Sequence, residues 1–330
     1  MKAAVIDSPG AAIRIGERDV PEPAPGEIRI RVRACGVCRT DLHILDGDLP
    51  PHRVPLIPGH QIAGVVDAVG EGVTRFRAGD RAGASWLGWS CGACEYCLSG
   101  RENLCAGARF TGYDRDGGFA EVAIVDAAFA IPLPDRDPVA LAPFLCAGLI
   151  GFRAYRMAGE ARRLGLYGFG SAAHLLAQIA RHQGREVYAF TREGDAASRA
   201  LALGLGATWA GSSAGPAPVP LDAAIIFAPA GELVPLALRA VAPGGSVICA
   251  GIHMTAIPSF PYELLWGERT LRSVANLTRD DARAFFDAIR DIPLEARVTE
   301  YGLEDVGRAL EDLRAGRVSG SAVVVVSRDR

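Results

Sequence analysis

The sequence predicts an α/β protein with a β-rich domain first and a doubly wound parallel sheet after it. Three observations predict this class. Short alternating stretches separated by Pro and Gly fill residues 1–130. Apolar segments of strand length and helix length alternate from residue 139 onward. A chain of 330 residues is also long for a single hydrophobic core, so we expect two domains.

The change of pattern sets the expected boundaries. We expect the β-rich domain over residues 1–150 and the parallel-sheet domain over residues 151–290. Residues 291–330 contain a strand, a helix and a last strand, and we assign them back to the first domain.

In the β-rich domain, residues 27–33 alternate polar and apolar side chains, which indicates a half-buried strand. We also expect strands at residues 1–5, 62–69 and 118–125. A short helix is expected to begin near Thr40, whose hydroxyl could cap it.

The second half begins with an apolar stretch of helical length at residues 139–157. Strands and helices then alternate, which predicts a parallel sheet covered on both faces. The expected strands are 164–167, 186–190, 223–227, 246–250, 271–275 and 322–326, and the expected helices are 174–181, 195–205, 232–241 and 303–315.

Composition excludes several functions. The formal net charge of −3 does not favour nucleic acid as a partner. The longest apolar stretch, residues 139–151, is too short to span a bilayer, so we expect no membrane partner. The N-terminus lacks the layout of a signal peptide, which favours a cytoplasmic location with reduced cysteines. Lys2 is the only lysine, so Schiff-base chemistry at an internal lysine is excluded.

The stretch from Cys35 to His60 carries the candidate catalytic metal site. Thiolate and neutral imidazole are preferred zinc ligands, and a catalytic zinc takes three protein ligands with one open position. Cys38 and His60 are candidates for two of them, and Cys146 for the third. Either Cys38 or His60 alone could equally be a buried structural residue.

A four-cysteine lobe follows, with Cys91, Cys94, Cys97 and Cys105 in the spacing C-x2-C-x2-C-x7-C. This spacing suits a closed tetrahedral zinc site that stabilises the fold. An iron–sulfur cluster is the alternative, although the fourth cysteine comes later than in ferredoxin-type sequences.

A dinucleotide-binding fingerprint lies between the first strand and helix of the second half. Gly168, Phe169, Gly170, Ser171 and Ala173 fit G-x-G-x-x-G/A in this context. Gly168 permits the tight turn, and Gly170 lets the backbone approach a pyrophosphate at the helix N-terminus. The alternative is a glycine-rich turn without a ligand.

The end of the next strand indicates which cofactor is bound. NAD sites usually place an acidic residue there, whereas this chain has Thr191 and Arg192. A hydroxyl and a guanidinium suit a 2′-phosphate, which favours NADP(H). Glu193 or Asp195 could still serve NAD(H).

With these motifs in place, the chain resembles the zinc-dependent alcohol dehydrogenases of the medium-chain dehydrogenase/reductase family over essentially its whole length. The resemblance implies a GroES-like β domain, split in sequence, with a Rossmann domain between its parts. It rests on residues 36–43, 58–60, 79–81, the four-cysteine lobe, 143–148 and 168–170.

The resemblance also implies roles for residues near Cys38. Asp41 is expected to bond the far nitrogen of the ligand His60. Arg39 falls where the family contacts the cofactor pyrophosphate. Thr40 and His43 fall on the relay that carries the alcohol proton away, with His43 as general base. Zinc would act on the alcohol oxygen as a Lewis acid.

Three positions depart from the family pattern. Gln61 stands where many relatives have Glu, and Ile150 where relatives often have Thr. Leu49 replaces a second Trp of yeast-type enzymes, which share the Trp86 motif, so we expect a wider pocket that accepts alcohols larger than ethanol.

The other histidines and cysteines are expected to be structural or solvated. We interpret Cys35 and Cys249 as buried thiols. His174 and His182 are predicted to be solvated on a surface helix, and His52 could be structural or functional.

The expected activity is hydride transfer between a nicotinamide cofactor and a primary or secondary alcohol, or its aldehyde or ketone. One catalytic and one structural zinc ion are expected. The substrate would be a small molecule, and the resemblance implies a homo-oligomer. A polyol dehydrogenase is one alternative, and a non-enzymatic metal-binding redox module is another.

Overall fold

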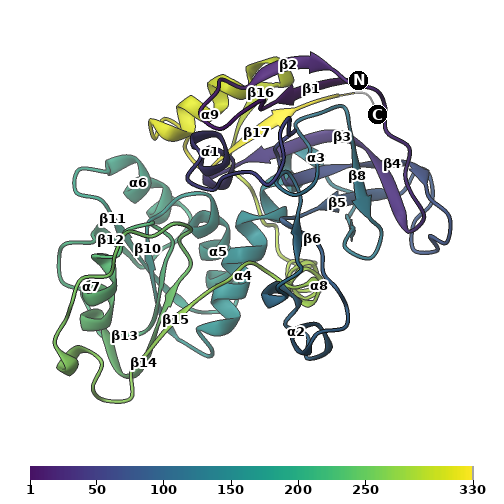
Figure 1. Ribbon diagram of the computed structural model, residues 1–330. Coiled ribbons are helices and arrows are strands. Elements are labelled where there is room, and N and C mark those ends of the chain that lie inside the picture. Colours follow the sequence, from purple (N-terminus) through teal and green to yellow (C-terminus); the bar gives the residue numbers. More distant parts are fainter. Residues whose placement is uncertain (329–330) are drawn as a thin grey trace. The chain divides into compact units, whose positions relative to one another are not determined.

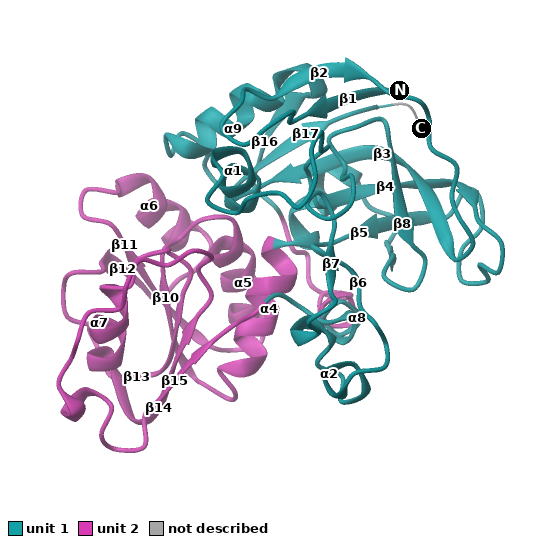
Figure 2. Ribbon diagram, in the orientation of Figure 1, with its two compact units in different colours: residues 1–146, 276–284, 296–330 teal, residues 147–275, 285–295 magenta. Residues whose placement is uncertain are grey.

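The computed structural model describes residues 1–328 and divides the chain into two compact units (Figure 2). Unit 1 comprises residues 1–146, 276–284 and 296–330, and unit 2 comprises residues 147–275 and 285–295. The N-terminal and C-terminal segments therefore belong to one unit, and the segment between them forms most of the other.

Unit 1 is built on a sheet in which β3 is the longest strand. The order is β16-β17-β3-β4-β5-β9, with β8 also paired to β3, and only the β16–β17 pair is parallel. The strands are β3 (Glu27–Val37), β4 (Gln61–Val69), β5 (Arg81–Ala84), β8 (Val122–Asp126), β9 (Ile131–Pro132), β16 (Val298–Gly302) and β17 (Ser321–Val325).

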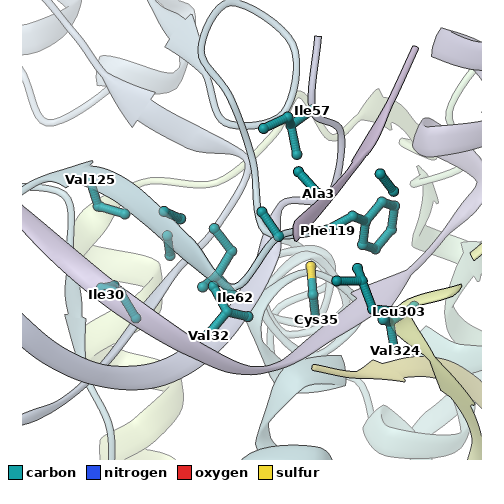
Figure 3. Packing of buried hydrophobic residues seen from close by; sticks show 14 of the residues in the cluster. Ala3, Ile30, Val32, Cys35, Ile57, Ile62, Phe119, Val125, Leu303 and Val324 are labelled. Atoms are coloured by element: carbon teal, nitrogen blue, oxygen red, sulfur yellow. The ribbon is translucent and has the colours of Figure 1, made fainter. Parts of the chain in front are cut away.

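Alternation along β3 sends its apolar side chains into the core. Ile28, Ile30 and Val32 are fully buried, as a period of two requires for a strand with one covered face. Figure 3 shows Val32 next to Ile62 of β4, and Ile30 and Phe119 belong to the same cluster of buried side chains. Each such side chain contributes about 1.5–3 kcal/mol by leaving water. This core fixes both ends of the segment that carries the candidate ligands.

The other elements of unit 1 surround this sheet (Figure 1). They are β1 (Lys2–Val5), β2 (Arg14–Glu17), α1 (Arg39–Asp46), β6 (Leu87–Trp89), α2 (Glu95–Leu98), η1 (Glu102–Leu104), β7 (Arg109–Phe110), α3 (Pro138–Leu141), η2 (Ala142–Leu145), η4 (Leu303–Asp305) and α9 (Val306–Arg314). The half-exposed ammonium group of Lys2, on β1, donates to Glu304 Oε1 at 3.1 Å.

Unit 2 contains a six-stranded parallel sheet in the order β12-β11-β10-β13-β14-β15. This is the 3-2-1-4-5-6 order of a Rossmann fold. Its strands are β10 (Arg163–Tyr167), β11 (Glu186–Thr191), β12 (Trp209–Ser212), β13 (Leu221–Ile226), β14 (Val241–Cys249) and β15 (Thr270–Ser273). The strands β10 and β13 are buried on both faces, as expected for a covered parallel sheet.

The helices that belong to unit 2 lie before and between these strands in the sequence. They are α4 (Ala147–Met157), α5 (Ser171–His182), α6 (Ala196–Gly204), α7 (Leu233–Ala240) and the short η3 (Tyr262–Leu264). The helix α8 (Arg279–Ala288) begins in unit 1 and ends in unit 2.

The fold differs from the sequence expectation in several elements, of which four matter most here. The stretch 139–157 is not one helix, because it is interrupted at Cys146 between η2 and α4. The strand β12 and the helix α8 were not expected. The helix α1 begins one residue before Thr40, and Cys38 rather than Thr40 occupies the cap position.

Among residues 1–328, no single helix has the length and hydropathy needed to cross a bilayer. The bent pair formed by Pro138–Leu145 and Ala147–Met157 meets those two criteria only when its two parts are taken together.

Candidate metal centres and cofactor loop

Cys38 lies at the junction of β3 and α1. The strand ends at Val37, and Cys38 keeps an extended backbone with φ of −139° before the helix begins at Arg39. Its backbone N–H donates to Asp41 Oδ2 at 2.9 Å. Because that carboxylate satisfies a free N–H of the helix start, Asp41 fixes the turn that presents the Cys38 thiol.

His60 and Cys146 reach the same place from distant parts of unit 1. His60 is fully buried and directly precedes β4, whereas Cys146 lies in the break between η2 and α4. The three donor atoms all lie within 4.8 Å of one another, and Cys38 Sγ is 3.3 Å from His60 Nε2. The structure therefore brings together the three residues named from the sequence.

The spacing and chemistry of these three donors fit zinc. Bonds of about 2.3 Å to sulfur and 2.0–2.1 Å to nitrogen in a tetrahedron place those two donor atoms about 3.5 Å apart. The Cys38–His60 distance of 3.3 Å is close to that value. Two sulfurs and one imidazole leave a fourth position for another ligand, as in zinc enzymes.

Asp41 faces the other side of the His60 ring. Asp41 Oδ1 is 3.3 Å from His60 Nδ1, and both side chains are fully buried. The two atoms are within ion-pair distance, although their geometry falls short of a hydrogen bond. This contact orients Nε2 toward Cys38, as a carboxylate behind a ligand imidazole does in metal sites.

The ionisable side chains of this site shift one another's pKa values. The Cys146 thiol lowers the pKa of Cys38 well below its ordinary value, with further help from His60 and the Thr40 hydroxyl. Burial lowers the pKa of His60, but the Cys38 thiolate and Asp41 outweigh it and raise that pKa to about 10. A divalent cation takes the place of such protons, because metal ligands bind in their deprotonated forms.

Thr40 and His43, expected on the proton relay, both lie on α1. Thr40 is buried, and its hydroxyl bonds the Cys38 sulfur. His43 is partly exposed, and its Nδ1 lies 3.0 Å from Asp48 Oδ2. Arg39, the expected pyrophosphate contact, is exposed on the first turn.

The four cysteines of the lobe also meet at one point in unit 1. Their sulfurs all lie within 4.8 Å of one another, and Cys97 Sγ is 3.8 Å from Cys91 Sγ and 3.6 Å from Cys94 Sγ. A tetrahedron of 2.3 Å zinc–sulfur bonds gives sulfur–sulfur distances of about 3.8 Å. An iron–sulfur cluster would hold the cysteines farther apart, because its own iron and sulfide atoms lie between them. The geometry fits a single zinc ion.

The glycine-rich loop lies between β10 and α5 in unit 2. Gly168 has φ of +88°, and an added Cβ would stand 3.0 Å from Ala228, so glycine is required there. Gly170 is exposed, and an added Cβ would meet no atom within 4 Å. The Phe169 side chain is buried, whereas Ser171 begins the helix. The loop therefore leaves open space next to Gly170 at the helix N-terminus, where a phosphate fits.

The end of β11 presents two arginines. Arg192 is exposed, and the Arg199 Nε of α6 donates to the buried Thr191 Oγ1 at 3.1 Å. Asp195 instead caps α6 by accepting from Ser198 N at 3.0 Å. Sequence reasoning did not name Arg199, because its contact with Thr191 spans eight residues and has no motif.

The structure tests the predicted burial of two cysteines and the predicted exposure of two histidines. Cys35 and Cys249 are buried, as predicted. The expectation that His174 is solvated was wrong: its side chain is 1% exposed, and its Nδ1 lies 3.3 Å from the Gly170 carbonyl oxygen. The covered face of α5 includes this position, whereas His182 in the last turn is exposed.

Comparison with known proteins agrees with this fold. Residues 24–135 match the model of the alcohol dehydrogenase GroES-like domain. The chain is 51% identical over 316 residues to a probable alcohol dehydrogenase of Mycobacterium tuberculosis, covering 93% of this chain and 91% of that protein.

Solved structures give the same result. A cinnamyl alcohol dehydrogenase from Sorghum bicolor aligns with a TM-score of 0.90 and 26% identity over 100% of this chain and 98% of that chain. A zinc-binding dehydrogenase from Sinorhizobium meliloti 1021, bound to NADP, aligns with a TM-score of 0.88 and 29% identity over 98% and 99% of the two chains. The chain belongs to the zinc-dependent alcohol dehydrogenases of the medium-chain dehydrogenase/reductase family. Its activity is hydride transfer between an alcohol and a nicotinamide cofactor.

Proposed function

We propose that Cys38, His60 and Cys146 hold the catalytic zinc of an NADP(H)-preferring alcohol dehydrogenase. The observation that carries this is the convergence of the three donor atoms within 4.8 Å beside the Thr40 hydroxyl. In this assignment unit 1 is the catalytic domain and unit 2 is the cofactor-binding domain. The four-cysteine lobe holds the structural zinc.

The residues of the proposed active site would have the following roles. A zinc ion on the three ligands would supply a Lewis acid for the alcohol oxygen. Asp41 holds the His60 ring in the orientation that ligation needs. Thr40 and His43 would pass the alcohol proton toward solvent, with Asp48 holding His43 Nδ1. Arg39 and the Gly170 backbone would bind the pyrophosphate.

Two positively charged side chains support NADP(H) as the preferred cofactor. Arg192 is exposed just after β11, and Arg199 lies beside it with Nη2 3.3 Å from the Arg192 carbonyl oxygen. Two guanidinium groups at this strand end suit a 2′-phosphate better than ribose hydroxyls. The nearest capping carboxylate, Asp195, is already occupied by Ser198 N–H.

Initial rates with NADPH and NADH against a panel of aldehydes test this proposal. The expected result is a higher kcat/KM with NADPH. The substitution Arg192→Ala should raise the KM for NADPH about tenfold or more and leave that for NADH nearly unchanged, since a bond to a charged group contributes about 1.5–3 kcal/mol. Arg162→Ala is the matched control, because Arg162 pairs with Glu186 at the opposite end of β11. A wild-type preference for NADH would contradict the NADP(H) assignment.

The pocket is proposed to accept alcohols larger than ethanol. Leu49 packs in the same apolar cluster as Trp86, and the Trp86 ring stands 5.1 Å from the ring of His60. A leucine fills less of this space than a second tryptophan would. Turnover of benzyl alcohol at least equal to that of ethanol is expected, and a strict preference for ethanol would contradict it.

We further propose a homo-oligomer and a cytoplasmic location. The strand β15 is an edge of the unit 2 sheet, and the nearby Tyr262 and Trp266 side chains are about two-thirds exposed. These features suit association with a second copy. Six cysteines proposed as zinc ligands need a reducing compartment.

A further inference from the structure

The loop of residues 47–56, which follows α1, is fastened by side chains on both sides of Leu49. Asp48 bonds His43, and the Tyr113 hydroxyl donates to the Pro50 carbonyl oxygen at 2.9 Å. The Leu49 N–H itself donates to the His43 carbonyl oxygen at 3.0 Å. Because both neighbours and its own backbone are held, the position of Leu49 is set by polar contacts as well as by packing.

A second set of polar contacts holds this loop at His52, two residues after Pro50. His52 Nδ1 is 2.6 Å from Asp114 Oδ1, and His52 Nε2 is 3.2 Å from the Tyr113 hydroxyl. The other carboxylate oxygen of Asp114 accepts from Phe110 N at 2.7 Å, which anchors the carboxylate to the last residue of β7. The loop is therefore attached to residues 110–114 through one connected group of polar side chains.

The donors and acceptors of Tyr113, His52 and Asp114 are paired within this group and with Pro50. The Tyr113 hydroxyl has one proton, which goes to the Pro50 carbonyl oxygen, so its oxygen can accept from His52 Nε2. His52 Nδ1 must also carry a proton to bond the Asp114 carboxylate. The two contacts of the His52 ring therefore join Tyr113 to Asp114.

Tyr113 also connects this loop to the metal site. Its side chain is 5% exposed, and its ring centroid is 5.7 Å from that of Trp86. The Trp86 ring stacks on Phe110 at 5.0 Å and meets the His60 ring edge-on at 5.1 Å. Leu49, Trp86 and Phe110 all pack on the buried cluster that contains Tyr113. Tyr113 thus touches both the side of the pocket next to the ligand and the loop that carries Leu49.

We propose that Tyr113, His52 and Asp114 are positioning residues for substrate size, because they hold Leu49 against Trp86 as one wall of the alcohol pocket. This proposal rests on the proposed function. A small alcohol gains contact with the wall only when the wall is held in place. A bulky alcohol fills the pocket in either case, so loosening the loop changes the selectivity rather than the chemistry.

The test compares kcat/KM for ethanol and benzyl alcohol in Tyr113→Phe, which keeps the ring and removes the bond to Pro50. The benzyl-to-ethanol ratio should rise about fivefold through a higher KM for ethanol with little change in kcat. A fivefold change corresponds to about 1 kcal/mol. The control is Tyr301→Phe, since the Tyr301 hydroxyl is equally buried and donates to Asp312 at 2.9 Å elsewhere in unit 1. Its ratio should not change.

His52→Ala is the second variant, because His52 is largely exposed and its removal should not prevent folding. It should shift the ratio in the same direction by about twofold to threefold. If Tyr113→Phe does not fold, the benzyl-to-ethanol ratio of His52→Ala tests the proposal alone. An unchanged ratio in folded variants, or an equal loss for both alcohols, would overturn the proposal while leaving the proposed function intact. A wild-type enzyme that oxidises neither alcohol would overturn both.

Discussion

Three of the proposed thiolate ligands stand directly before the first residue of a helix. Cys38 precedes α1, Cys94 precedes α2 and Cys146 precedes α4. The free N–H groups at a helix start favour an anion. Of these three thiols, Cys38 has a pKa well below its ordinary value, with the Cys146 side chain as the main cause, whereas the pKa values of Cys94 and Cys146 are raised. The backbone N–H of Cys94 also donates to Cys91 Sγ at 3.3 Å. Backbone N–H groups therefore lie close to sulfurs at both proposed metal sites.

The two metal sites should respond differently to loss of one ligand. Cys38→Ser should abolish turnover and remove one of two zinc equivalents while the melting temperature stays near that of the wild type. Cys94→Ser should lower the melting temperature first, because it opens the site that closes the lobe. Zinc content by mass spectrometry and thermal unfolding measure both. The control is Cys249→Ala, a buried thiol outside both sites, which should keep both zinc equivalents. Equal effects of Cys38→Ser and Cys94→Ser would argue against separate roles.

The two glycines of the cofactor loop should also differ. Gly168→Ala should cost about 1–2 kcal/mol of folding free energy, because its left-handed backbone and the Ala228 contact penalise a Cβ. Gly170→Ala should leave stability unchanged, since its Cβ would meet no protein atom. It should raise the dissociation constant for NADPH about tenfold by occupying the space left for the phosphates. Urea unfolding and cofactor titration separate the two. Unchanged cofactor affinity in Gly170→Ala would contradict phosphate binding there.

At the scale of elements, sequence pattern predicted those with clear periodicity and missed those without it. The buried strands β10 and β13 and the alternating β3 were expected from their apolar pattern. The break at Cys146 could not be predicted, because an unbroken apolar stretch carries no sign of where its helix stops. The strand β12 was missed because its four residues show no alternation.

The same limit applies to the candidate site. The sequence named the seven candidate cysteine and histidine ligands that the structure brings together in two groups. For the four-cysteine lobe the spacing is itself the signal. Contacts between distant side chains were not predictable: Arg199 with Thr191, Tyr113 with Pro50 and Glu102 with Arg279 have no local signature. They depend on which segments the fold places side by side. We predicted that His174 is solvated because histidine is polar. Its position on the covered face of α5 buries it instead.

The four-cysteine lobe is joined to the start of α8 by one buried carboxylate. Glu102, on η1, accepts from the backbone N–H and from Nε of Arg279 at 3.0 and 3.1 Å. Burial by itself raises the pKa of Glu102, but these two contacts outweigh it and leave that pKa below its ordinary value of 4.5. The contacts therefore stabilise the fold above pH 4.5, and their contribution is lost as pH falls through the lowered value.

Glu102→Gln should lower the free energy of unfolding by about 1–3 kcal/mol at pH 7, because the buried bonds lose their charge. The difference from the wild type should shrink at a second pH, below the lowered pKa of Glu102, where the wild-type carboxyl is also neutral. Urea unfolding at the two pH values measures it. Asp287→Asn, in an exposed pair with Arg290, should change stability little. A difference that stays constant with pH would show that charge is not the cause.

At the scale of the whole molecule, the proposed association is testable without activity. Light scattering after gel filtration should give a multiple of the mass of one chain. Trp266→Glu should reduce that multiple, because it places a charge on the exposed aromatic pair with Tyr262. Leu98→Glu is the control, since Leu98 is an exposed apolar residue on the lobe. A wild-type monomer would exclude the homo-oligomer.

The lone lysine has a practical consequence. Lys2 is the only lysine of the sequence, so the only amine on a side chain lies at the start of β1. Reagents that attack amines would attach a dye, a resin or a biotin at that end alone. Every molecule on such a support would face the liquid in the same way, with both cysteine-rich centres chemically untouched.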